Sequence, residues 1–137
     1  MRLLIDINVL LDVALQRPAA PASARLLALC GRRHEAWLAW HSIATLAYLI
    51  ERQTSAVSSR DFIRGLLDWA DVAATGKADA RAALELPLTD FEDALQVAAA
   101  MACGAQFIVT RNERDFRKSP VPALSPDSFL RRHGSLS

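Results

Sequence analysis

Two short apolar runs that each end in a polar residue constrain the fold of this chain most strongly. Residues 2–6 (RLLID) and residues 106–110 (QFIVT) have the length and apolar content of buried strands. Segments with apolar residues at helical spacing lie between them. Strands that alternate with helices form parallel sheets covered on both faces. The sequence therefore predicts an α/β fold.

The remaining elements follow from spacing and from turn residues. Further strands are predicted at residues 36–40, 72–75 and 120–124. Helices are predicted from residue 7 to Pro18, from Pro21 or Ser23, from His41 or Ser42, from Ser58 or Ser59, over residues 77–84, from a Thr89–Glu92 capping box to Gly104, and after Ser125 and Pro126. This order predicts one domain over residues 1–137. Its fold is expected to be a three-layer α/β/α sandwich around a mostly parallel sheet of about four to five strands.

Composition excludes several classes of protein. The 137 residues are 52% apolar, enough for one core, and Cys30 and Cys103 lack the spacing of a zinc site. No apolar stretch reaches the roughly 20 residues needed to cross a bilayer, and no leader precedes the first strand, so we expect a cytoplasmic protein without membrane association. A net charge of +1 argues against a protein that coats nucleic acid through one broad basic surface.

Three carboxylates are expected at one edge of the sheet. Asp6 ends the first strand, Asp115 follows the QFIVT strand, and Asp93 begins the helix that leads into that strand. The carboxyl ends of parallel strands meet at one edge, so these side chains should converge. Carboxylates that lie close together repel unless a divalent cation neutralises them, and oxygen ligands favour Mg²⁺ or Mn²⁺ over zinc. Such a site best matches hydrolysis of phosphodiester bonds.

Each carboxylate also has a structural explanation. Asp6 could cap the turn after its strand, and Asp93 could be a first-turn acid favoured by the helix dipole. Glu92 fits the capping box, while Asp12 and Asp90 fit helix-surface or cap positions. Spacing alone therefore leaves metal binding and local capping open for these residues.

The segments DINVLLDVALQR (residues 6–17) and TDFEDALQVAAAMACGAQFIVTRNERDF (residues 89–116) resemble the PIN-domain family. More narrowly, the chain is similar to free-standing bacterial PIN proteins and to the VapC-like toxin components of type II toxin–antitoxin systems. The resemblance implies a PIN fold, ribonuclease activity that depends on Mg²⁺ or Mn²⁺, inhibition by a small antitoxin protein, and a homodimer. It also implies that Asp6 and Asp93 bind the metal and that Asn8 and Thr110 support them.

Two positions depart from the family pattern. Tyr48 stands where the family usually has a glutamate, and Asn112 stands where it often has an aspartate, so Asn112 is expected only in a supporting role. A site with fewer carboxylates should hold its metal more loosely, and we expect weak or conditional activity. The acids that could compensate are Glu51, Glu92 and Asp115.

The function expected from these features is metal-dependent endoribonuclease activity on RNA. Asp6, Asp93 and Asp115 form the expected catalytic site, and Arg111 or Arg114 is expected to touch phosphate. The alternative is a catalytically weak or inactive PIN module that binds RNA or a protein partner. A phosphate-accepting receiver or phosphatase fits poorly, because no Asp-x-Asp follows the first strand and no lysine follows QFIVT.

The tryptophans offer no obvious platform for stacking RNA bases. Trp37, Trp40 and Trp69 all lie within apolar patterns, so they are expected in the core. The sequence therefore predicts RNA as a substrate without predicting which bases are preferred.

Overall fold

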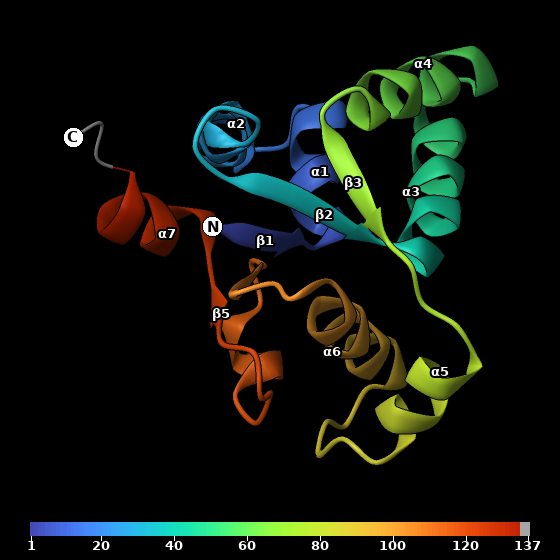
Figure 1. The fold of residues 1–137 in the computed structure, drawn as a ribbon. Helices are drawn as coiled ribbons and strands as arrows, with labels where there is room; N and C mark the ends of the chain where they lie inside the picture. Colours follow the sequence, from blue (N-terminus) through green and yellow to red (C-terminus); the bar gives the residue numbers. More distant parts are fainter. Residues whose placement is uncertain (135–137) are drawn as a thin grey trace.

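The computed structural model describes residues 1–134 and has a five-stranded sheet at its centre (Figure 1). The strands follow the order β3-β2-β1-β4-β5, and all neighbouring strands pair in parallel. Their bounds are β1 Arg2–Ile5, β2 Glu35–Ala39, β3 Ala70–Ala73, β4 Phe107–Val109 and β5 Ala123–Leu124. The predicted parallel sheet is confirmed, with β1 in the middle of it.

Helices cover both faces of this sheet (Figure 1). One face packs against α1, α2, α3, α4 and α7, whereas α6 covers the other face and α5 packs against α6. The bounds are α1 Ile7–Ala14, α2 Ala20–Leu29, α3 Trp40–Gln53, α4 Ala56–Leu67, α5 Lys77–Leu84, α6 Phe91–Cys103 and α7 Pro126–His133, with a short 3-10 helix η1 at Glu113–Phe116. The expected three-layer α/β/α sandwich is therefore confirmed.

Strand β1 is buried on both faces, which explains its uninterrupted apolar run. Leu3 and Ile5 belong to the core beneath α1, and Leu4 belongs to the core beneath α6. Each of the three is fully buried. Burying one leucine or isoleucine contributes roughly 1.5–3 kcal/mol. Because β1 is held from both sides, the residue that follows it, Asp6, has a well-defined position.

Helix ends follow local chemistry, and several occur where the sequence predicts them. Ser125 caps α7 by accepting a hydrogen bond from the Ser128 amide at 3.1 Å, with Pro126 in the first turn. Gly104 ends α6 with a φ of 71°, a left-handed conformation that side chains with a Cβ rarely adopt. The predicted bounds of α5 are also those observed.

The predicted Thr89–Glu92 capping box is wrong by one residue. Asp90 is the cap of α6, and its carboxylate accepts a hydrogen bond from the Asp93 amide at 3.1 Å. Aspartate is at least as good a cap as threonine, so two adjacent candidates made the start of the helix ambiguous. The correction matters because it frees the Glu92 side chain for other contacts.

Other boundaries shift by a few residues. Strand β2 ends at Ala39, one residue early, and β3 begins at Ala70, two residues before the prediction. Helix α4 begins after a Ser55 cap rather than after Ser58 or Ser59. Two of the tryptophans lie at the ends of elements, so their predicted burial is wrong: Trp40 is 67% exposed and Trp69 is 37% exposed.

The seven helices of residues 1–134 are all too short or too polar to cross a membrane.

Candidate functional site

Asp6 lies at the carboxyl end of β1 and is nearly buried, with 8% of its surface exposed. The Thr110 hydroxyl donates to its Oδ2 at 2.8 Å, and the Gln96 side-chain amide donates to its Oδ1 at 3.3 Å. Burial raises the pKa of Asp6, the Thr110 hydrogen bond opposes the rise, and the negative charge of Glu92 adds to it. Three separate elements therefore meet at this carboxylate.

Asp93 lies in the first turn of α6 and is partly buried. Burial, and after it the negative charges of Asp90, Glu92, Asp115 and Asp6, together raise the pKa of this carboxyl group to about 7. Asp93 therefore lies within electrostatic range of all four of these acids. A helix amino end normally favours an ionised acid, so the crowding outweighs the helix dipole at this residue.

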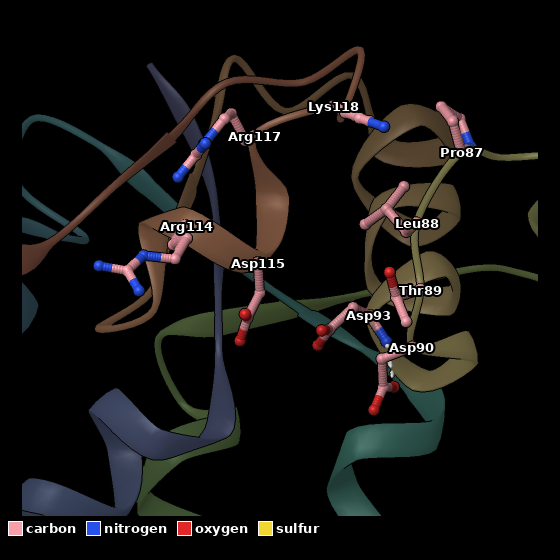
Figure 2. Close-up of a pocket in the computed structure, with 9 residues that line it drawn as sticks. All are labelled: Pro87, Leu88, Thr89, Asp90, Asp93, Arg114, Asp115, Arg117 and Lys118. Carbon is pink, nitrogen blue, oxygen red and sulfur yellow. Dashed lines mark hydrogen bonds between the residues drawn. The ribbon is translucent and has the colours of Figure 1, made fainter.

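A cavity of about 500 Å³ lies beside Asp93 (Figure 2). The carboxylates of Asp93 and Asp115 point into the same space from α6 and from η1. Basic side chains from the segment after β4 contribute to the same wall. The lining consists of Pro87, Leu88, Thr89, Asp90, Asp93, Arg114, Asp115, Arg117 and Lys118. The cavity thus combines acids that attract a cation with basic groups that attract an anion.

Glu92 faces the N-terminal end of α3. Its Oε1 lies 3.1 Å from His41 Nε2 and 3.5 Å from Gln96 Nε2. One side-chain oxygen each from Asp90, Glu92 and Asp93 fall within 4.8 Å of one another. Glu92 is therefore part of the acidic cluster.

Asp12 is fully buried, which corrects its assignment to the helix surface. Its Oδ2 lies 3.3 Å from Arg111 Nε and accepts a hydrogen bond from the Ser23 hydroxyl at 3.1 Å. Its Oδ1 lies 3.9 Å from a guanidinium nitrogen of Arg17. Arg111, expected at substrate phosphate, is thus engaged with a buried carboxylate on the face of the sheet that α1 and α2 cover.

The remaining predicted residues divide into two groups. Asn112 is exposed, and its backbone amide donates to the Thr110 hydroxyl at 3.1 Å, while Asn8 sits in the first turn of α1 two residues after Asp6. Tyr48 and Glu51 are exposed on α3, and Tyr48 stacks with Arg52 at 5.6 Å. Neither Tyr48 nor Glu51 lines the cavity beside Asp93.

The structure also adds residues that sequence reasoning missed: His41, Gln96, Arg117 and Lys118. The four-residue spacing of Glu92 and Gln96 on one helix was a usable signal, because such residues are neighbours on a helix surface. The contact between His41 and Glu92 joins residues 51 positions apart, and it forms only because the fold brings the first turn of α3 near the first turn of α6.

The donor atoms fit a hard divalent cation. Carboxylate oxygens are the ligands that such ions prefer, and Asp90, Glu92 and Asp93 supply them. Crowded carboxylates and a raised pKa are the state expected of such ligands when no cation offsets their charge. The side-chain oxygen of Gln96 is buried and has no hydrogen-bond partner within residues 1–134.

The comparisons with known proteins agree with this fold. A family model described as a PIN domain matches residues 2–114. VapBC2 from Rickettsia felis bound to a DNA fragment from their promoter contains a chain that matches with a TM-score of 0.73 at 16% identity, covering 91% of this chain and 98% of that one. VapBC-1 from nontypeable Haemophilus influenzae gives a TM-score of 0.71 at 14% identity, covering 93% and 99%. No curated protein sequence matches significantly.

The chain therefore belongs to the PIN-domain family. PIN domains are generally nucleases, and PIN nucleases typically use divalent metals. The fold, with its five-stranded parallel sheet and seven helices in residues 1–134, matches that of VapC structures.

Proposed function

We propose that this protein is an endoribonuclease that uses Mg²⁺ or Mn²⁺ to hydrolyse RNA. Asp6, Asp93 and Asp115 are the proposed acids of the catalytic site, and Asp6 and Asp93 are the proposed metal ligands. The observation that carries the proposal is the crowding at Asp93, where four neighbouring acids and burial raise the pKa to about 7. Retaining such repulsion costs stability, so a bound cation is its most direct explanation.

A bound divalent cation would activate water and offset the charge that develops on the phosphodiester. Side chains of the protein itself would hold the proposed metal ligands in place for this chemistry. Thr110 and Gln96 fix the direction of the Asp6 carboxylate, and Asn112 in turn donates to Thr110. Asn8 is proposed to support the same acid from the first turn of α1. Buried, hydrogen-bonded ligands hold their geometry better than exposed ones.

The substrate is proposed to enter along the basic wall of the cavity. Arg114, Arg117 and Lys118 line the same cavity as Asp93 and Asp115 and are exposed, and Figure 2 shows Arg114 next to Asp115. Arginine and lysine neutralise phosphate oxygens, and such contacts fix the position of a nucleic acid strand without reading its bases. Arg114 therefore retains its expected role, whereas Arg111 is assigned to Asp12.

We further propose that the protein is the toxin of a type II toxin–antitoxin pair and acts as a homodimer. Support comes from the sequence resemblance to such toxins and from the two VapBC structures with the same fold. Co-expression with the product of a neighbouring gene should yield a stable complex in which RNA cleavage is suppressed. A neighbouring product that neither binds nor inhibits would leave the nuclease proposal standing and remove the toxin assignment.

The nuclease proposal is tested by cleavage of single-stranded RNA in the presence of Mn²⁺, Mg²⁺ or a chelator. Cleavage should require a divalent cation, and Asp6→Asn or Asp93→Asn should lower the rate by about a hundredfold or more. Circular dichroism of each variant checks that the fold is intact. A wild-type protein that binds RNA but never cleaves it would support the non-catalytic PIN module instead.

A further inference from the structure

A line of polar contacts connects the N-terminal turn of α3 with the buried Asp6. His41 Nε2 lies 3.1 Å from Glu92 Oε1, and the Gln96 side-chain amide lies 3.5 Å from the same oxygen. That amide also donates to Asp6 Oδ1 at 3.3 Å. Glu92 and Asp6 are thus joined through one buried amide, although one residue opens a helix and the other ends a strand.

The placement of Glu92 suits a ligand better than a surface ion pair. The contacts of Glu92 with His41 and Gln96 both use Oε1, so Oε2 is left for another partner. One side-chain oxygen of Glu92 lies within 4.8 Å of one from Asp93, and the Gln96 amide contacts both Glu92 and Asp6, which places Glu92 close to both acids. The His41 and Glu92 side chains are 30% and 50% exposed, and such a pair contributes little to stability.

Gln96 provides an independent sign that a ligand belongs here. Its side chain is 1% exposed, and its Oε1 has no hydrogen-bond partner among the described residues. A buried amide oxygen without a partner is destabilising. The nitrogen of this amide contacts Asp6 and Glu92, and its oxygen can accept a hydrogen bond from a water molecule bound to a cation.

We propose that Glu92 is a further ligand of the divalent cation and that His41 is the residue that positions it. This inference rests on the proposed function, because it adds a third carboxylate to the site of Asp6 and Asp93. With Nε2 protonated, His41 donates to Oε1 and turns Oε2 toward the other acids. Glu92 supplies the negative charge that the chain lacks at Tyr48, and the Tyr48 ring stacks with Arg52 instead.

The test is calorimetric titration of the full chain with Mn²⁺ alone, without RNA. Glu92→Gln should weaken Mn²⁺ binding by about tenfold or more, and His41→Ala should weaken it by about tenfold, as loss of an orienting partner does. His41→Gln keeps a donor near the same position and should restore most of the affinity. Glu85→Gln changes an exposed glutamate directly after α5 that does not line the cavity, so it is the matched control and should bind as wild type does.

Each result bears on one claim. If Glu92→Gln binds Mn²⁺ as tightly as wild type while Asp6→Asn and Asp93→Asn lose binding, the Glu92 assignment is overturned and the proposed function stands. If Asp6→Asn and Asp93→Asn also bind normally, the proposed function itself fails. A His41→Gln variant as weak as His41→Ala would show that the histidine does not act through its hydrogen bond. Melting temperatures in chelator should be nearly equal for wild type and the His41 and Glu92 variants, because this half-exposed pair contributes little to stability.

Discussion

At the scale of single residues, Asp93 carries the clearest electrostatic signature. Its pKa is about 7 in the folded protein, compared with 3.8 for an unperturbed aspartate. Between these two values the folded state binds a proton that the unfolded state has released. Raising the pH through this range therefore lowers the free energy of unfolding, and the full penalty is present above about pH 7.

This dependence of the free energy of unfolding on pH predicts how an Asp93 variant should behave. In chelator, Asp93→Asn should be more stable than wild type at pH 8, and the difference should shrink as the pH falls toward 4. Urea unfolding of both proteins at several pH values measures it. Glu85→Gln serves as an exposed control and should show no such trend. A difference that is independent of pH would mean that Asp93 is not crowded in the folded state.

At the scale of elements, the segment after β4 is fixed from two sides. Thr110 reaches Asp6, while the next residue, Arg111, reaches the buried Asp12 on α1. The ion pair anchors the chain just before η1, which carries Asp115 to the cavity. Breaking a buried pair from one side is costly because the remaining charge stays away from water.

The same substitution at Arg111 and at Arg114 should therefore have different effects on stability and on RNA binding. Arg111→Met should lower the free energy of unfolding by about 3 kcal/mol, since Asp12 would keep only Ser23 and the more distant Arg17. Arg114→Met should change stability by less than about 0.5 kcal/mol but weaken RNA binding and its dependence on salt. Chemical denaturation and RNA titration at two salt concentrations separate the two effects. The reverse pattern would return Arg111 to the substrate-binding surface.

At the scale of the whole molecule, the candidate site exists only because the sheet brings distant segments of the chain together. Asp6, Thr110 and Asp93 come from the beginning and the end of the chain, and the pairing of β1 with β4 brings them together. Unfolding separates these residues, so the unfolded chain offers no comparable cation site. A cation that binds only the folded state must stabilise all of it.

Divalent cations should accordingly raise the melting temperature. Mn²⁺ at a hundred times its dissociation constant should add about 2.7 kcal/mol, or roughly 10 °C for a domain of this size. An Asp6→Asn, Asp93→Asn double variant should show no such gain, and calcium-free buffers with chelator give the baseline. Equal shifts for wild type and double variant, measured by differential scanning calorimetry, would place the cation elsewhere.

The sequence by itself determined the class of fold, and it proposed Asp6, Asp93 and Asp115 as the acids of the candidate site. Apolar runs of strand length and helical segments with clear start and stop signals predicted the sandwich, because these patterns depend on local spacing. The same patterns placed Asp6 and the residue after Val109 at one edge of a parallel sheet. Asp115 was also predicted there, and it lines the cavity with Asp93.

Only the tertiary structure decided what the other polar groups do. The choice between Thr89 and Asp90 as cap, the burial of Asp12 and its pairing with Arg111 all depend on which helices pack together. The contact of His41 with Glu92 likewise requires α3 to lie beside the start of α6. Contacts of this kind join residues far apart in the chain, so local sequence spacing cannot predict them. They depend on the burial and the charge of these side chains in the folded protein.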